Sequence, residues 1–269
     1  MENNFISFKN ENDRFFDIFS SYYEQFYGNI AVNKIVDAWF DALLEAGLKK
    51  KLSESSQDTL QLLDVGCGPG WYMNAWSEKG FMVYGLDSSS NMIALARNKF
   101  QNSNHPVSFF TADIRNIGAS IITQYKFDVI TSHFNFLNLF PANELQSVFH
   151  NIALLAKRGC FWITDCSLPK YLPHSHQENY DIGNNKILTR KGFWNKSLNC
   201  FEYTWKLDGE DIKHGERYWF HSLITYRSLS AEAGWELKKC YRSQITNREL
   251  TLSPFSDDAE HIVIIFEKV

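Results

Sequence analysis

The feature that most constrains this chain is a glycine-rich turn between an apolar run and an amphipathic segment. Residues 62–70 read LLDVGCGPG, so glycine stands at every second position of the turn, at Gly66, Gly68 and Gly70. Because glycine lacks a Cβ atom, it tolerates positive φ and lets a ligand approach the backbone closely. The pattern predicts a buried parallel strand that passes into a helix, with a ligand bound at the turn.

Strands and helices are expected to alternate around this turn. Five apolar segments predict strands, at 60–65, 82–87, 106–111, 126–132 and 159–165. Amphipathic stretches between them predict helices, at 70–79, 90–101 and 141–157. Alternation of this kind predicts βαβ units, a parallel sheet and right-handed crossovers. Ligands of such sheets bind beyond the carboxyl ends of the strands.

The two ends of the chain follow other patterns. Residues 13–29 predict a helix followed by a loop, and 31–46 predict a stronger helix that Gly47 ends. After Asp165, strict alternation of apolar and polar residues at 201–207 predicts a half-buried antiparallel strand. The remaining elements are a hairpin loop at 195–199, a third strand at 216–221, a helix at 223–233 and strands at 235–243 and 260–268. We interpret 1–269 as a single domain with an N-terminal helical cap (1–50) and a β-rich insertion (166–221).

Charge and cysteine content exclude several classes of partner. The net charge is −4 with a pI near 6.1, and no basic run exceeds Lys49–Lys51, so neither a nucleic acid nor an anionic membrane is expected as partner. The five cysteines show no CxxC pair and no metal-ligand spacing, so no metal is expected and a reducing compartment fits. The polar N-terminus and short apolar runs predict a soluble, cytoplasmic protein.

Three acidic residues and one tryptophan indicate which ligand the turn binds. Asp64 stands two residues before the first glycine, Asp87 follows it by 21 residues, and Asp113 comes just after the next predicted strand. A carboxylate at Asp87 can accept hydrogen bonds from both hydroxyls of a ribose. Trp71 occupies the position where a dinucleotide fingerprint has its third glycine, which disfavours a nicotinamide cofactor. Taken singly, each aspartate could equally be a helix cap or a turn residue.

Together these residues resemble the cofactor site of class I S-adenosylmethionine-dependent methyltransferases of the small-molecule type. The resemblance covers roughly 15–165 and, more weakly, 216–268. It implies an α/β fold with a Rossmann-like, seven-stranded, mostly parallel sheet in the order 3-2-1-4-5-7-6. Helices would cover both faces, and a β-rich insertion would precede the last helix.

The resemblance also implies a role for individual residues. In that family the glycine loop carries the methionine portion, the acid after the second strand binds the ribose, and the acid after the third strand meets the adenine amino group. These roles correspond here to Gly66, Gly68 and Gly70, to Asp87, and to Asp113 with Ile114 beside the adenine. Further contacts with S-adenosylmethionine are implied for Tyr23, Asp64, Cys67, Ser88, Met92 and Ser132.

The acceptor side is less specific, because methyl transfer from a sulfonium is an in-line displacement that mainly needs alignment of the nucleophile. The segment 131–139 resembles the substrate-facing wall of small-molecule methyltransferases, and His133 in it is the candidate general base. Its alternative is a histidine that contacts only the cofactor or the backbone. No proline-containing motif of nucleic-acid methyltransferases is present there, so we expect a small-molecule acceptor methylated at N or O. The insertion would form an acceptor lid or a homodimer contact.

Two other functions remain open from the sequence. One is a nicotinamide-dependent oxidoreductase, and the other is a protein of the methyltransferase fold that binds the cofactor without catalysing transfer.

Overall fold

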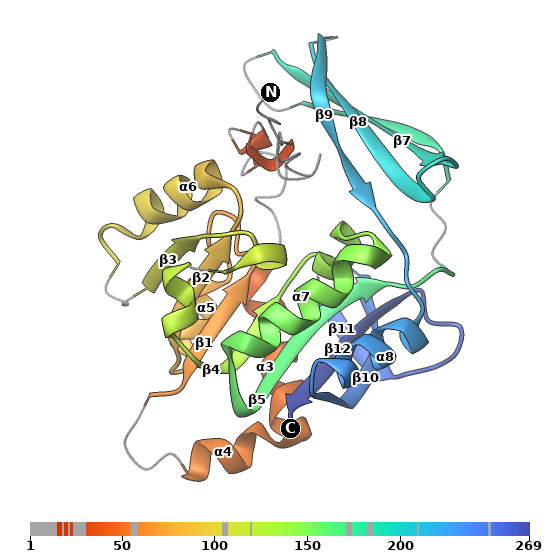
Figure 1. Ribbon diagram of the computed structural model, residues 1–269. Helices are drawn as coiled ribbons and strands as arrows, with labels where there is room; N and C mark the ends of the chain where they lie inside the picture. Colours follow the sequence, from red (N-terminus) through yellow and green to blue (C-terminus); the bar gives the residue numbers. More distant parts are fainter. Residues whose placement is uncertain are drawn as a thin grey trace, which may run out of the picture. The chain divides into compact units, whose positions relative to one another are not determined.

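The computed structural model describes residues 15–17, 19–20, 22–23, 31–54, 59–103, 107–118, 120–170, 174–181, 185–208, 210–246 and 249–269 (Figure 1). The chain divides into two compact units, each described here by itself. The larger holds the described residues of 29–172 and 219–269, and the smaller holds those of 1–28 and 173–218. Of the smaller unit, the part at 173–218 lies within the expected insertion but is shorter, because strand β5 (Ala156–Ser167) stays paired in the larger unit. The single-domain organisation stays a prediction.

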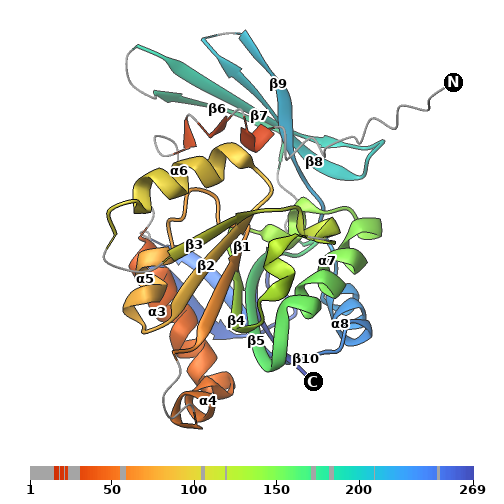
Figure 2. The same cartoon turned by 60° about the vertical axis from the view of Figure 1, so that its left-hand side comes forward.

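An eight-stranded sheet runs through the larger unit, with helices on both faces (Figures 1 and 2). The strands lie in the order β11-β10-β12-β5-β4-β1-β2-β3. Besides β5 they are β1 (Gln61–Val65), β2 (Met82–Asp87), β3 (Val107–Thr111), β4 (Phe127–Ser132), β10 (Trp235–Thr246), β11 (Glu249–Pro254) and β12 (His261–Lys268). Strands β1 to β5 pair in parallel, whereas β10, β11 and β12 pair antiparallel to their neighbours. The predicted Rossmann-like fold and its order 3-2-1-4-5-7-6 are therefore confirmed.

The sheet has one strand more than the seven expected. Strand β11 pairs antiparallel with β10, from Tyr241 opposite Pro254 to Thr246 opposite Glu249. It covers the edge that β10 would otherwise leave open. Leu250 and Leu252 of β11 pack onto the hydrophobic core, which gives the added strand a buried face.

The helices divide between the two faces of the sheet. On one face lie α3 (Val32–Leu43), α5 (Met73–Glu78) and α6 (Ser90–Phe100); on the other lie α7 (Ala142–Leu155) and α8 (Leu223–Glu232). Serine side chains cap the N-termini of α6 and α8. The hydroxyls of Ser89 and Ser222 accept hydrogen bonds from the N–H groups of Met92 and Thr225, respectively, at 3.1 Å.

Gly47 interrupts the helical path, as predicted. In the turn Leu44–Leu48 that follows α3, Gly47 has a non-helical φ of 128°, and a separate helix, α4 (Lys49–Glu54), begins beyond this kink. Glycine adopts that φ without strain. The helix expected at 70–79 begins only at Met73, because the glycine turn extends to its start. Most of the helix expected at 13–29 lies outside the described residues.

The smaller unit contains a four-stranded antiparallel sheet. Its strands are β6 (His176–Asp181), β7 (Ile187–Asn195), β8 (Cys200–Leu207) and β9 (Glu210–Tyr218), paired in that order. The predicted strand at 201–207 and the hairpin loop before it are confirmed, whereas the third strand lies earlier than 216–221. Leu188 and Trp205 form a small core with Phe15 and Phe19.

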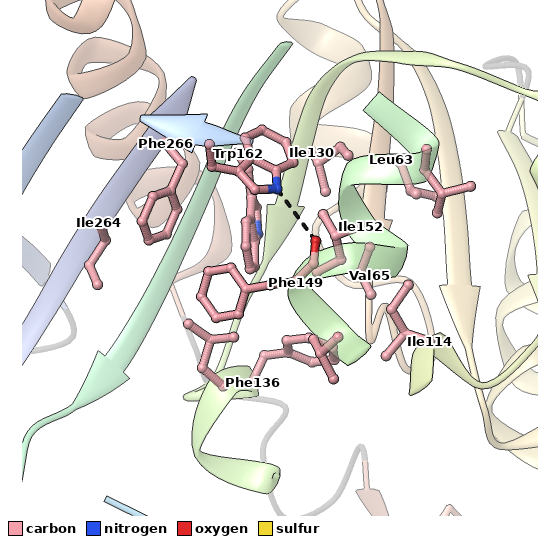
Figure 3. Close-up of a cluster of buried hydrophobic side chains, with 14 of the residues drawn as sticks. Leu63, Val65, Ile114, Ile130, Phe136, Phe149, Ile152, Trp162, Ile264 and Phe266 are labelled. Atoms are coloured by element: carbon pink, nitrogen blue, oxygen red, sulfur yellow. Dashed lines mark hydrogen bonds between the residues drawn. The ribbon is translucent and has the colours of Figure 1, made fainter. Parts of the chain in front are cut away.

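The core under α7 is built from large aromatic side chains (Figure 3). The ring of Phe149 lies 5.0 Å from that of Trp162 and 5.7 Å from that of Phe266, with edge-to-face geometry in both pairs. All three side chains are fully buried. Helix α7 is thereby anchored to β5 and β12.

Substitution of Phe149 should therefore test this anchor. We expect Phe149→Ala to lower the free energy of unfolding by about 3–5 kcal/mol, because it removes a buried ring and leaves a cavity. Leu154→Ala on the same helix is the matched control: Leu154 is 46% exposed, so a change within about 0.5 kcal/mol is expected. Urea unfolding followed by circular dichroism measures both, and equal losses would contradict the prediction.

Candidate active site

The glycine turn is held on strand β2 by its own backbone. The carbonyl oxygen of Leu86 accepts hydrogen bonds from the N–H groups of Gly66 (2.7 Å) and Cys67 (3.0 Å). Gly66, Gly68 and Gly70 all have positive φ, of 75°, 52° and 77°. A Cβ atom at Gly68 would meet nothing within 4 Å, so open space lies beside the backbone there. The turn thus has the conformation and the clearance expected of a ligand cradle.

Asp87 lies at the carboxyl end of β2 and closes the turn. One carboxylate oxygen accepts a hydrogen bond from the N–H of Gly68 at 2.8 Å, and the other accepts one from the N–H of Ser89 at 2.9 Å. The ribose-binding role of Asp87 stays a prediction with which this geometry is compatible.

Asp64 is buried at the end of β1 and lacks a full set of partners. Its Oδ1 accepts a hydrogen bond from the Thr131 hydroxyl at 2.9 Å, whereas its Oδ2 is buried with no hydrogen-bond partner in the described part of the chain. Burial, opposed by the Thr131 hydrogen bond and reinforced by the charge of Asp87, raises the pKa of Asp64 to about 8. A buried oxygen without a partner is costly, so a donor brought by a ligand would be favourable here.

Asp113 serves as a helix cap and an ion-pair partner. Its Oδ1 accepts a hydrogen bond from the N–H of Arg115 at 2.9 Å, which caps the 3₁₀ turn Ile114–Asn116. The Arg115 guanidinium binds both carboxylate oxygens and also reaches Glu144 at 3.2 Å. The structural alternative is thus observed for Asp113, and its adenine-binding role stays a prediction.

The other residues expected at the cofactor differ in accessibility. Ser88 is half-buried beside Asp87, whereas Met92 in the first turn of α6 and Ile114 are buried. Ser132 is fully buried, and its hydroxyl donates to Thr164 at 2.8 Å and accepts from the Trp162 indole at 3.1 Å. A contact of Ser132 with the cofactor would therefore have to use its backbone.

Cys67 and Tyr23 complete the expected set. Cys67 is buried, and burial raises the pKa of its thiol well above the usual range, so the group stays protonated. Tyr23 belongs to the smaller unit, where it packs against Phe19 with ring centroids 6.2 Å apart. The cofactor roles of both residues stay predictions.

His133 follows β4 and is enclosed by aromatic rings. Its imidazole stacks on Tyr72 at 3.7 Å and on Trp39 at 4.0 Å, and its Nε2 accepts a hydrogen bond from the Trp76 indole at 3.4 Å. Burial lowers the pKa of His133 well below its usual value, so the ring is neutral near pH 7. The lone pair on Nε2 faces an indole, so the ring must release Trp76 before that nitrogen can take a proton. The base role of His133 stays a prediction.

A cavity of about 290 Å³ opens beside His133, at the carboxyl ends of β4 and β5. One wall comes from Trp39 and Tyr72, and the residues after β4, His133 to Asn135, form another. The rest of the lining comes from α3 and from strands β5, β10, β11 and β12. These residues are Ile35 of α3, Asp165 and Cys166 of β5, Ser243 and Ile245 of β10, Leu250 of β11, and His261 and Val263 of β12. The cavity thus occupies the position where sheets of this kind bind ligands.

The sequence analysis missed Asp165 as a site residue. Its Oδ2 accepts a hydrogen bond from the N–H of Asn135 at 3.0 Å, and its Oδ1 is buried without a partner in the part of the chain that the structure describes. The sequence does contain one indication of its role: Asp165 is an acidic residue at the end of a predicted strand of the parallel sheet. Phe134 and Asn135 have left-handed φ values of 62° and 55°, a strained pair at the cavity wall.

No group of three or more His, Cys, Asp or Glu side chains among the described residues could hold a metal ion. None of their helices is both long and apolar enough to cross a membrane.

Comparisons with known proteins agree with the geometry. A family model described as a methyltransferase domain matches residues 62–159. A protein from Geobacillus sp. (strain WCH70) that carries the name of a methyltransferase is 26% identical over 209 residues, which cover 70% of this chain and 80% of that protein.

Solved structures share the fold over almost the whole chain. An S-adenosylmethionine-dependent methyltransferase from Clostridium acetobutylicum aligns with a TM-score of 0.69 at 17% identity, covering 95% of this chain and 98% of that one. Magnesium protoporphyrin IX methyltransferase from Synechocystis, solved with S-adenosylhomocysteine bound, aligns with a TM-score of 0.56 at 15% identity, covering 96% and 98%.

The residues present suit S-adenosylmethionine. The open backbone at Gly68 gives clearance for a ligand, and the unpartnered Oδ2 of Asp64 awaits a donor such as an amino group. Asp87 presents a carboxylate to hydroxyl groups at the next strand end.

The buried carboxyl of Asp64 should make stability depend on pH in a defined direction. Because burial raises its folded-state pKa to about 8, the unfolded chain releases this proton near pH 4 while the folded chain keeps it. The wild-type protein therefore loses stability as pH rises from about 4 to 8, by at most about 1.4 kcal/mol per pH unit from this group. Asp64→Asn keeps an oxygen for Thr131 but cannot ionise, so its stability relative to wild type should rise across that window.

Urea unfolding of the two proteins at several pH values between 4 and 8 measures the difference. Asp41→Asn, at an exposed position of α3, is the control and should leave the difference flat. A flat difference for Asp64→Asn as well would show that Asp64 is ionised in the folded protein.

Proposed function

Because the chain is a class I S-adenosylmethionine-dependent methyltransferase, we propose that it methylates a small molecule at nitrogen or oxygen. The observation that carries the proposal is the cavity at the ends of β4 and β5, whose volume of about 290 Å³ suits a small acceptor. Tyr72 lines this cavity and also lies two residues after Gly70 of the glycine turn, so cofactor and acceptor would be neighbours.

The cofactor would be held mainly by the strand ends. The glycine turn and the free oxygen of Asp64 would hold the methionine portion, and Asp87 with Ser88 would hold the ribose. Asp113, Ile114 and Met92 would surround the adenine, while Cys67, Ser132 and Tyr23 would supply further contacts. When bound, S-adenosylmethionine supplies a methyl group on a sulfonium, a good leaving group.

The main contribution of this chain to methyl transfer would then be to align the acceptor with the methyl group and to exclude water. The stacked rings of Trp39, His133 and Tyr72 form a rigid wall, because two face-to-face contacts and one hydrogen bond fix the imidazole. A rigid wall holds a nucleophile in line with the methyl group, which converts a bimolecular step into an intramolecular one. We propose that this positioning, with His133 as the candidate base, accounts for catalysis.

We also propose a cellular location, a role for the smaller unit and a class of partner. All five cysteines are free thiols, four of them buried, which supports a cytoplasmic location. The antiparallel sheet of the smaller unit would act as an acceptor lid or as a homodimer contact. Neither a nucleic acid nor a membrane is proposed as a partner, because the chain carries a net charge of −4.

Loss of Asp87 should weaken cofactor binding. We expect Asp87→Ala to reduce the affinity for S-adenosylhomocysteine at least about tenfold, because hydrogen bonds to charged groups contribute about 1.5–3 kcal/mol. Titration calorimetry measures the affinity, and thermal unfolding checks that the variant is folded. Asp41→Ala is the control and should bind like wild type. Unchanged affinity in Asp87→Ala would overturn the ribose assignment.

The acceptor itself can be found by release of S-adenosylhomocysteine from S-adenosylmethionine in the presence of small amines, alcohols and phenols. Turnover with one chemical class supports the proposal. Binding of NADH in place of S-adenosylhomocysteine, or turnover with oligonucleotides only, would contradict it.

His133→Phe then separates positioning from base catalysis. The phenyl ring keeps both stacking contacts, so kcat should fall less than about tenfold if positioning dominates, whereas loss of a general base costs about 10²–10⁴-fold. S-adenosylhomocysteine affinity is the control and should not change. A hundredfold loss of kcat at unchanged affinity would assign the base role to His133.

A further inference from the structure

Asp165 places an incompletely paired carboxylate at the wall of the cavity. Its Oδ2 is used by the N–H of Asn135, while its Oδ1 is buried and has no hydrogen-bond partner among the described residues. A buried carboxylate oxygen without a donor is unfavourable, because the interior does not replace its lost hydration. A ligand that brings a donor would relieve that cost.

We propose that the cavity binds its acceptor as an ammonium ion, with the N–H of the amine donating to Oδ1 of Asp165. Before transfer, the ammonium would give one proton to the Asp165 carboxylate, which frees the nitrogen lone pair. That lone pair would form the new N–C bond as the S–C bond to the methyl group breaks and S-adenosylhomocysteine leaves. The inference rests on the proposed function and narrows it from nitrogen or oxygen to nitrogen. The substrate class is a small amine with an apolar body.

The chemistry of the walls supports a cation. Among the described residues that line the cavity there is no lysine or arginine, so none of these side chains neutralises the Asp165 charge. Trp39, Tyr72 and Phe134 supply aromatic surface, which favours cations and the apolar body of an amine. An anionic acceptor would meet a like charge there, and a neutral alcohol would leave that charge unpaired.

The position of the carboxylate is also well defined. Asn135 donates its backbone N–H to Asp165, and its side-chain oxygen accepts a hydrogen bond from the Ser167 hydroxyl at 2.9 Å. Ser167 in turn contacts Nδ1 of His261 at 2.8 Å. This network connects the strained loop after β4 to β5 and β12, so the carboxylate of Asp165 is held in a fixed position for the ammonium group.

Burial raises the pKa of Asp165 to about 6, against the lowering effect of the backbone N–H groups of Asn135, Asp165 and Phe134. The carboxyl is therefore still ionised at pH 8, where small aliphatic amines are cationic.

Three ligands of one shape test the inference: cyclohexylamine, cyclohexanol and cyclohexanecarboxylate. Each is titrated at pH 8 against protein saturated with S-adenosylhomocysteine, with calorimetry as the readout. We expect the amine to bind at least about tenfold more tightly than the alcohol, since a charged hydrogen bond is lost in the alcohol. Equal or tighter binding of the alcohol or the carboxylate, or no binding of any of the three, would overturn the inference.

Two variants assign the preference to Asp165. Asp165→Asn keeps an oxygen for the N–H of Asn135 but removes the charge, so amine and alcohol should then bind within about twofold of each other. Asp41→Asn, the same loss of charge at an exposed position of α3, is the control and should keep the preference of the wild type. An amine preference that survives in Asp165→Asn would overturn the role of Asp165.

The same samples separate this inference from the proposed function. Failure of S-adenosylhomocysteine to bind wild-type protein would count against the function itself. Normal binding of S-adenosylhomocysteine together with turnover of alcohols but not amines would keep the function and reject the ammonium site.

Discussion

The hydrogen bonds that close the glycine turn onto strand β2 are the constraint on which the site depends. The Leu86 carbonyl receives two backbone N–H groups from the turn, and the Asp87 carboxylate receives the N–H of Gly68. These bonds require the positive φ values that glycine adopts without strain. They bring the ends of β1 and β2 together and set the clearance beside Gly68.

Buried carboxylates have opposite roles at the two ends of the sheet. Asp128, near the amino end of β4, binds Lys51 at 3.3 Å, Lys157 at 2.8 Å and the N–H of Gln61 at 3.0 Å. Although burial alone would raise the pKa of Asp128, these partners lower it. Asp64 and Asp165, at the carboxyl ends, each keep a buried oxygen without a partner in the described part of the chain. A carboxylate paired with lysines therefore lies at the amino end of the sheet, and carboxyl groups with an unpartnered oxygen lie at the ligand-binding end.

Local patterns predicted the parallel sheet and the glycine turn well. Strand positions follow from runs of apolar residues, and Asp87 could be placed from its spacing to Gly66. The extra strand β11 was missed because it gains its stability by pairing with β10, which a short segment does not reveal.

The sequence by itself determined the doubly covered parallel sheet, the conformation of the glycine turn and the resemblance to a methyltransferase cofactor site. These features depend on residues close together in the chain, so their periodicity and backbone preferences can be recognised in short segments of the sequence. Only the tertiary structure decided that Trp76 donates to His133 and that Asp165 keeps an unpartnered oxygen beside a cavity. Both depend on segments far apart in the chain, because packing of those segments decides which buried groups find a partner.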